Sequence, residues 1–238
     1  MSRRVVLEVR DVDVFYGSSQ ILFGVGLEVF EGQTMALLGR NGAGKSTTMK
    51  AIAGLAPPRR GTIRVLGEAM AGRKPHVIAR AGVGYVPEDR QVFPEHTVED
   101  NLSIAQKKGV DGRDEWSLKR VYDVFPLLEP LRHRIAGGLS GGEQQMLAIA
   151  RTLMGNPMMI VLDEPSEGLA PIVVQRIGEL LRTLRASGAT ILIAEQNMHF
   201  CLRVASDATV IDKGQIVYRD TIAALKENQE VRQRYLAL

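Results

Sequence analysis

Residues 39–46 have the types and spacing of a loop that holds phosphate groups. They read GRNGAGKS, which fits the pattern G-x-x-x-x-G-K-[ST]. Glycines let backbone N–H groups turn inward around phosphate oxygens. The alternative, a glycine turn ahead of a surface lysine, is disfavoured because an apolar strand precedes the loop and a helix follows it. The predicted ligands are the phosphates of a nucleotide and Mg²⁺, with Lys45 on the β- and γ-phosphates, Ser46 on the metal, Thr47 on a phosphate, and Gly39, Arg40, Asn41, Gly42, Ala43 and Gly44 as the cradle.

A pair of carboxylates, Asp163 and Glu164, directly follows the apolar residues 159–162. An acid at the end of a strand beside a phosphate loop can bind Mg²⁺, here through water. The acid after it can orient or deprotonate the water that attacks the γ-phosphate. The alternative is that both acids cap the helix that Pro171 opens, but their pairing with the phosphate loop favours the chemical roles. We therefore predict Asp163 as a metal ligand and Glu164 as the catalytic base.

A second predicted anion site begins a helix at residues 139–145, which read LSGGEQQ. Ser140 can cap this helix, and Glu143 stands where a capping box places its acid. Free N–H groups and the helix dipole attract anions there. An ordinary capped helix is the alternative. Together with the phosphate loop and the two acids downstream, however, this segment resembles the signature motif of the ATP-binding-cassette (ABC) ATPases, and the resemblance covers essentially the whole chain.

The resemblance implies a partner. In ABC ATPases two nucleotide-binding domains pack head to tail, and the signature helix of each points at the γ-phosphate held by the other. Ser140, Gly141 and Gly142 would therefore contact the partner's ATP, and a chain with one set of motifs must pair with another chain.

Two further segments match the family. Tyr16 resembles the aromatic residue that stacks on adenine, with a core aromatic at a strand end as the alternative. Residues 93–102 resemble the helical edge that receives a coupling helix from a transmembrane partner.

Three positions depart from the general ABC pattern. The Q-loop glutamine is Glu88, for which we predict a metal contact, the D-loop aspartate is Ala170, and the switch histidine is Gln196. Glutamine can donate a hydrogen bond to phosphate but cannot carry the positive charge of a histidine. His199 lies one helical turn further on, where it could compensate or serve as a surface or packing residue. The predicted catalytic residues are thus Lys45, Glu164 and Gln196.

These departures together resemble one subgroup, the LivF-like ATPases of bacterial branched-chain amino-acid uptake. The resemblance implies a heterodimer with a similar but distinct ATPase, although a homodimer is possible in isolation. It also implies two transmembrane permease subunits, a periplasmic solute-binding protein as an indirect partner, and a peripheral place on the cytoplasmic face of the inner membrane. Relatives of this shape also serve urea, short amides and aromatic acids, so the solute stays open.

The elements that position these motifs follow from the hydrophobic pattern. Alternation predicts antiparallel strands near the N-terminus, at residues 5–10, 12–16 and 21–30. Short apolar runs predict buried strands at 35–38, 83–86, 159–162 and 190–193, with a further strand at 62–66. Helices are predicted at about 44–54 and from Pro171 to Gly188. We expect a single α/β nucleotide-binding domain over residues 1–238, with a mainly parallel sheet, an N-terminal antiparallel β subdomain and a helical subdomain at about 90–154.

Composition reduces the number of function classes that fit the chain. The chain has 238 residues, a formal net charge of +3 and one cysteine, which suits a reducing cytoplasm. No apolar run is long enough to span a membrane, and the first residues do not resemble a signal peptide.

A soluble ABC protein that clamps nucleic acid or a ribosome is the main alternative to an importer ATPase. Such proteins typically carry two cassettes or a long coiled-coil insertion. This chain has neither, and its paired basic residues are isolated, so we predict no nucleic-acid partner. An exporter ATPase is disfavoured by the subgroup pattern.

Overall fold

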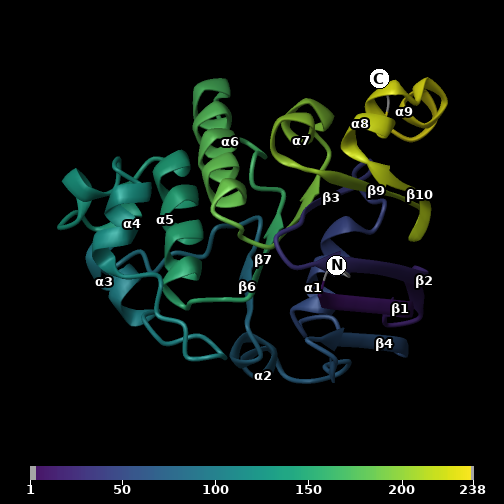
Figure 1. Cartoon of the computed structure of the whole chain (residues 1–238), viewed down its shortest axis with the longest axis horizontal. Coiled ribbons are helices and arrows are strands. Elements are labelled where there is room, and N and C mark those ends of the chain that lie inside the picture. The colour runs from purple at the N-terminus through teal and green to yellow at the C-terminus, as the bar shows by residue number, and fades with distance from the viewer. Residues whose placement is uncertain (1–3, 237–238) are drawn as a thin grey trace.

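A six-stranded sheet forms the centre of the molecule in the computed structural model, which describes residues 4–236 (Figure 1). Neighbouring strands are parallel except β10, which is antiparallel to β9. Every residue of β3, β7 and β8 is buried, because both faces of the sheet are covered. The strands are β3 (Thr34–Leu38), β6 (Val83–Val86), β7 (Met159–Asp163), β8 (Ile191–Glu195), β9 (Asp207–Asp212) and β10 (Gln215–Thr221), in the order β10-β9-β3-β8-β7-β6.

A second, antiparallel sheet has the strand order β2-β1-β4-β5. Its alternating sequence places buried residues such as Val12 and Val14 on one face and leaves the other face in solvent. The strand predicted at 62–66 lies at 60–65 instead, because its pairing with β1 continues across an irregularity to Asp13↔Arg60. The strands are β1 (Val5–Tyr16), β2 (Ser19–Phe30), β4 (Arg60–Val65) and β5 (Glu68–Ala69).

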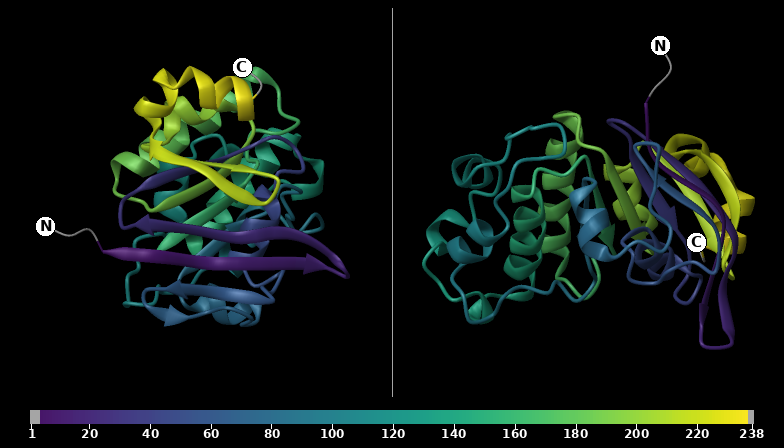
Figure 2. Two further views of the ribbon diagram at one scale, coloured as in Figure 1. Left: turned by 90° about the vertical axis from the view of Figure 1, so that its right-hand side faces the viewer. Right: turned by 90° about the horizontal axis from the view of Figure 1, so that it is seen from below.

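Helices cover the large sheet on both faces. Helix α1 lies between the two sheets, whereas α5, α6 and α7 cover the opposite face (Figures 1 and 2). The chain between β6 and β7 carries α3, α4 and α5, at the end of the molecule away from the antiparallel strands (Figure 2). The boundary of a separate helical subdomain at 90–154 stays a prediction. The helices are α1 (Lys45–Ile52), α2 (Pro75–Arg80), α3 (Val98–Ile104), α4 (Leu118–Val124), α5 (Gly141–Met154), α6 (Pro171–Ala186), α7 (Met198–Val204), α8 (Ile222–Glu227) and α9 (Gln229–Tyr235).

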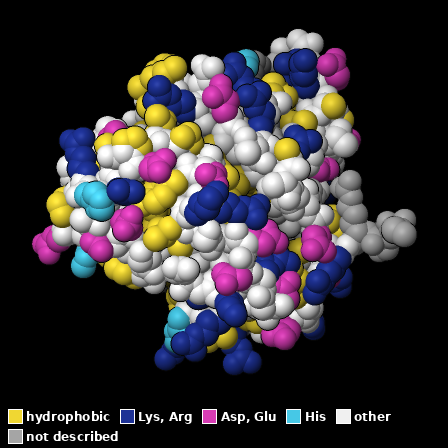
Figure 3. Space-filling view, turned by 60° about the vertical axis from the view of Figure 1, so that its left-hand side comes forward, with side chains coloured by type: hydrophobic (Ala, Val, Ile, Leu, Met, Phe, Trp, Pro, Cys, Tyr) yellow, Lys and Arg dark blue, Asp and Glu magenta, His cyan; other side chains and the backbone are white. Residues whose placement is uncertain are grey.

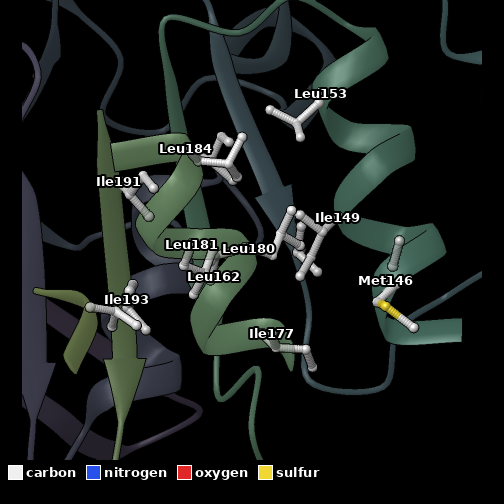
Figure 4. Close-up of a cluster of buried hydrophobic side chains, with 14 of the residues drawn as sticks. Met146, Ile149, Leu153, Leu162, Ile177, Leu180, Leu181, Leu184, Ile191 and Ile193 are labelled. Carbon is white, nitrogen blue, oxygen red and sulfur yellow. The ribbon is translucent and has the colours of Figure 1, made fainter. Parts of the chain in front are cut away.

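Two hydrophobic clusters lie on the two faces of the large sheet. Adjacent strand residues alternate between them, so Leu37 joins the cluster under the antiparallel sheet and Leu38 joins the cluster under the helices. Figure 4 shows the helical side, where apolar side chains of α5 and α6 meet those of β7 and β8 in one cluster. Leucines and isoleucines such as Leu162 and Ile193 fill this layer. The packing fixes the strand ends from which the polar motifs extend.

The C-terminal third contains elements for which the sequence pattern made no prediction, namely β9, β10 and the helices α7, α8 and α9. Strand β9 pairs with β3 on the side away from β8, so residues from both ends of the chain complete one sheet. No helix within residues 4–236 has the combined length and apolarity needed to cross a membrane.

Candidate active site

The predicted motifs lie at the carboxyl ends of three adjacent parallel strands, β3, β8 and β7. Leu38 pairs with Glu195, and Asp163 pairs with Ala194, so the three strands end at the same level. The phosphate loop follows β3, the two acids end or follow β7, and Gln196 follows β8. In open α/β sheets, ligands bind in the crevice outside such strand ends.

The loop between β3 and α1 is packed from below and open above. A Cβ on Gly39 would clash with the Ile211 carbonyl, and one on Gly44 would lie 2.8 Å from Leu22 Cδ2. Gly44 also has φ +111° as the residue before α1, which disfavours any other residue. Gly42 has φ +77°, and no atom of the described residues lies within 4 Å of a Cβ position there. Helix α1 begins without a side-chain cap and without an acid in its first turn, so its N–H groups are available to an anion.

The Lys45 side chain is 3% exposed and points back over this loop. Its Nζ donates to the carbonyl oxygens of Gly39 at 3.0 Å and Arg40 at 3.1 Å. The same amino group lies 3.0 Å from Glu164 Oε1. A buried ammonium requires such partners, because burial without them is costly. The amino group is therefore held directly above the loop, next to the carboxylate for which we predicted the base role.

Asp163, the last residue of β7, is 1% exposed. Its carboxylate accepts hydrogen bonds from the Ser46 hydroxyl and from Tyr85 Oη, the latter at 3.2 Å. Burial raises the pKa of Asp163, and the two hydrogen bonds oppose that rise. Burial and the Asp163 charge also raise the pKa of Tyr85. Oδ1 of Asp163 is buried with no hydrogen-bond partner within the described chain. A buried acceptor of this kind, beside a serine hydroxyl, fits the ligand shell of a hydrated Mg²⁺.

Glu164 follows β7 in a strained backbone conformation, with φ +48°. Its N–H donates to Ala194 O at 2.9 Å, which ties the residue to the end of β8. Glu167 lies beside it. A hydrogen bond shared with the Glu164 carboxylate, together with partial burial, raises the pKa of Glu167 to about 7. Carboxyl groups with pKa values raised in this way are common at functional sites.

Tyr16, at the end of β1, is 49% exposed and is not a core residue. It lines a pocket of about 270 Å³ together with Gly42, Gly44, Lys45 and other loop residues. The core-aromatic alternative is therefore wrong, because the ring has an open face beside the loop. A stacking role on adenine stays a prediction.

Gln196 is exposed directly after β8 and lines a second pocket, of about 460 Å³, with Glu164 and Glu167. The residue before it, Glu195, is 2% exposed. The Glu195 carboxylate accepts from Ser166 N at 3.0 Å and from Asn197 N at 3.2 Å. Burial raises the pKa of Glu195, and the hydrogen bond from Ser166 opposes the rise.

The signature segment begins α5 as predicted, with a capping box. Ser140 N donates to Glu143 Oε2 at 2.7 Å, and Glu143 N donates to Ser140 Oγ at 3.4 Å. Gly141 faces the Arg90 guanidinium, and Gly142 packs against Val173. The structure does not bring this segment to the phosphate loop of the same chain, since α5 and α1 lie on opposite sides of β7 (Figure 1). None of the residues 140–142 lines the Tyr16 pocket.

The remaining predicted positions lie at the edge of this region. Glu88 is exposed in the turn after β6, and its charge contributes to the raised pKa of Glu167. Ala170 is the exposed residue that precedes α6. His199 is also exposed, in the first turn of α7. No side chain in this group is in hydrogen-bond contact with Asp163 within the described residues.

Sequence reasoning missed three residues of the site: Tyr85, Glu167 and Glu195. Tyr85 could have been found, because a tyrosine in the predicted strand 83–86 lies beside β7. Glu167 and Glu195 were visible as acids near the motifs. Their partners, however, are a neighbouring carboxylate and two backbone N–H groups, which no spacing rule reveals.

Comparisons with known proteins extend over nearly the whole chain. The sequence pattern of the ABC transporter family matches residues 22–167. BraG of Pseudomonas aeruginosa, a high-affinity branched-chain amino acid transport ATP-binding protein, is 42% identical over 97% of this chain and 99% of its own. The probable branched-chain amino acid transport ATP-binding protein LivF of Archaeoglobus fulgidus is 35% identical over 90% and 92%. The lipopolysaccharide export protein LptB of Escherichia coli is 32% identical over 97% and 96%.

Solved structures share this fold over nearly the whole length of both chains. An ATP-binding cassette of an ABC transporter in its ADP conformation aligns with a TM-score of 0.81 at 27% identity, over 96% of this chain and 97% of that one. A nucleotide-free ATP-binding cassette from an ABC transporter aligns with a TM-score of 0.80 at 27% identity, over 95% and 97%.

Proposed function

The chain belongs to the ABC transporter family and is an ATP-binding cassette ATPase, and from that premise we propose that it powers the import of branched-chain amino acids or a related small solute. The family and fold predicted from the signature segment are thereby confirmed, as is the enzyme class. The observation that carries the ATPase chemistry is the Lys45–Glu164 pair above a phosphate loop beside buried Asp163.

The choice of solute rests on the relatives. The Pseudomonas and Archaeoglobus proteins are named for branched-chain amino-acid transport, and the former matches nearly end to end. A second candidate is export, because LptB of lipopolysaccharide export also matches across its length, though at lower identity. Urea, amides and aromatic acids remain within the proposed class of small solutes.

In the proposed reaction, the loop N–H groups and Lys45 bind the phosphates, and Glu164 accepts a proton from the attacking water. The ammonium of Lys45 exchanges its carbonyl partners for phosphate oxygens. That exchange frees the Glu164 carboxylate from its ion pair. Gln196, on the neighbouring strand end, donates a hydrogen bond to the γ-phosphate.

Ser46 and Asp163 are the residues that would hold Mg²⁺, with Glu88 as the further predicted contact. The buried, unpaired Oδ1 of Asp163 supports this assignment. When bound, the ion neutralises charge on the phosphates. The raised pKa of Asp163 has burial as its main cause, so the ionised form gains from a nearby cation.

The second half of the reaction surface belongs to a partner. Ser140, Gly141 and Gly142 start α5 away from their own phosphate loop, so we propose that they contact ATP held by a second ATPase chain. Heterodimers are the proposed state in the cell. Ala170 and Gln196 stand where the general ABC pattern has an aspartate and a histidine, and a distinct partner chain could carry both of these residues. We propose that the dimer sits peripherally on the cytoplasmic face of the inner membrane.

The proposed contact with the permease subunits centres on Phe93, which is 43% exposed. Asn101, which is fully buried, holds this residue from both sides: its Oδ1 accepts from Phe93 N at 2.9 Å, and its Nδ2 donates to Phe93 O at 3.0 Å. The Arg151 guanidinium lies 4.7 Å from the ring centre. Figure 3, in which the left-hand side of Figure 1 comes forward, shows hydrophobic side chains among charged ones. A rigidly held, exposed aromatic residue suits an interface anchor.

Uptake measurements test the importer assignment. A strain that lacks this chain should lose high-affinity uptake of labelled leucine, and the wild-type chain but not Lys45→Ala should restore it. Labelled urea and benzoate serve as the other small solutes. Normal uptake of all of these in the deletion strain would contradict import, and a defect in surface lipid or polysaccharide instead would favour the export candidate.

A further inference from the structure

Among residues 4–236, Glu195 is the one fully buried acid near the site for which the proposed reaction has no use. It is 2% exposed at the end of β8, between the strands that carry the phosphate loop and Asp163. No lysine, arginine or histidine within residues 4–236 forms an ion pair with it. A buried carboxylate is costly unless hydrogen bonds satisfy it. A buried carboxylate at this position therefore suggests a specific structural or functional role for Glu195.

The two oxygens of Glu195 bind two different segments. Oε1 accepts from the N–H of Ser166, two residues after Glu164. Oε2 accepts from the N–H of Asn197, the residue that follows Gln196. The Asn197 side chain in turn accepts from Phe200 N at 3.1 Å and caps α7. One carboxylate thus joins the segment of the proposed base to the segment of the proposed switch residue.

We infer that Glu195 is a positioning residue for ATP hydrolysis, which holds Gln196 in a fixed place relative to Glu164. The inference rests on the proposed role of Gln196. Because Gln196 lies between Glu195 and Asn197 in the chain, the bond to Asn197 N closes a tight turn that leaves the Gln196 side chain outside, in the pocket shared with Glu164 and Glu167. The bond to Ser166 N holds the opposite wall of that pocket.

Glu195→Gln is the sharpest single change, because it keeps the size of the side chain. An amide has one oxygen, so it can accept from one of the two N–H groups but presents an NH₂ donor to the other. One segment is therefore released while the strand is kept. We expect kcat for ATP hydrolysis to fall about tenfold. ATP affinity should stay within about twofold of wild type, because neither oxygen of Glu195 reaches the phosphate loop.

A double-mutant cycle separates positioning from general support of the fold. The phosphate-release rate of the full chain with Mg-ATP is measured for wild type, Glu195→Gln, Gln196→Ala and the double variant, and affinity is measured with a fluorescent ATP analogue. If Glu195 acts through Gln196, its replacement should cost about tenfold with Gln196 present but less than about twofold in the Gln196→Ala background. Equal losses in both backgrounds, or no loss at all, would overturn the inference.

The same cycle tests the role of Gln196 and the positioning role of Glu195 separately. A Gln196→Ala chain with full activity would refute the proposed role of Gln196 itself. An impaired Gln196→Ala chain with additive losses would refute only the positioning role of Glu195. If Glu195→Gln does not fold, Glu195→Thr replaces it in the cycle, since a β-branched residue suits the strand. Failure of both variants to fold would assign Glu195 to the stability of the protein and would also overturn the inference.

Discussion

The phosphate-loop end and the signature end of this chain are built in opposite ways. At the loop, Lys45 and Asp163 are almost fully buried, and the contacts come from three strand ends distant in sequence. At the signature end, Ser140 is exposed, and its hydrogen bonds close a capping box within four residues. The first end is a site assembled by the fold, whereas the second is a local helix start presented outward. This difference supports the proposal that the second end, and not the first, contacts a partner chain.

Lys45→Ala should have the largest effect, because it removes the only lysine of the loop. We expect hydrolysis to fall at least about a thousandfold, since a charge aimed at the transferred phosphate is lost from a dry site. ATP binding should weaken as well, and both are measured on the pure chain by phosphate release and equilibrium titration. Lys74→Ala, an exposed lysine before α2, is the control and should behave as wild type. Near-normal turnover of Lys45→Ala would show that the phosphate-loop end is not the ATP site.

Glu164→Gln should lower hydrolysis by about a thousandfold while ATP still binds, because an amide cannot take a proton from water. The expected product is a stable ATP-bound dimer on gel filtration, in which both ends of the chain are engaged. Glu68→Gln, on the exposed β5 strand, is the matched control. If Glu164→Gln hydrolysed ATP at the normal rate, another base would be required, with Glu88 and Glu167 as the first candidates.

Gly141→Asp tests the signature end alone. The only close contact of a new Cβ is the tip of the flexible Arg90 side chain, so the fold should tolerate it. The added carboxylate would face the partner's phosphate, and we expect dimer-dependent hydrolysis to fall about a hundredfold. ATP binding by the monomer should stay unchanged. Mixing this variant with Lys45→Ala should restore one working site per dimer.

Gly138→Asp is the control for charge, because a Cβ there has no atom of residues 4–236 within 4 Å. A loss of monomer ATP binding in Gly141→Asp, or no recovery on mixing, would mean that the two ends do not act on different chains.

Tyr16→Ala should weaken ATP binding roughly 5- to 150-fold, the range expected for one base stacked on an aromatic ring. Stability should change little, because the side chain is half exposed. Tyr16→Phe keeps the ring and should retain affinity. Titration with ATP and with inorganic triphosphate separates the base from the phosphates. An equal loss for both ligands would argue against stacking.

Gln196→His should have the smallest effect, a gain in the basal rate of about tenfold at most, because one donor replaces another. The pure wild-type chain should hydrolyse slowly, and the partner ATPase and membrane subunits should raise its rate. Phosphate release from the pure chain, the variant and the reconstituted complex provides the measurement. Full turnover by the pure wild-type chain, unchanged by histidine or partners, would remove the basis for an asymmetric pair.

Much of the fold could be predicted because its signals are local. Residues 159–162 are a short apolar run and form the body of β7, and Ser140 with Glu143 form the capping box that their spacing indicates. The C-terminal strands and helices were missed, because β9 is defined by its pairing with β3 across most of the chain. A pattern read over a few residues does not contain that partner.

The site was predictable to the same degree. Phosphate-loop positions follow from spacing, since glycines and a lysine must occupy fixed places on one turn. The Lys45–Glu164 contact, the unpaired Asp163 Oδ1 and the two bonds of Glu195 do not follow from spacing. These contacts form between residues at the ends of β3, β7 and β8, which are far apart in the sequence, and they depend on which polar groups the fold buries together.

The position of β3 between β8 and β9 has a consequence for synthesis of the protein. This apolar strand emerges early from the ribosome, yet both of its neighbours come from the last third of the chain. Until they arrive, β3 has two unpaired edges and no ATP site can close around the loop. Exposed edges of this kind favour aggregation during folding. Nucleotide should therefore act late in folding, as a ligand that stabilises chains in which β8 and β9 have already joined β3.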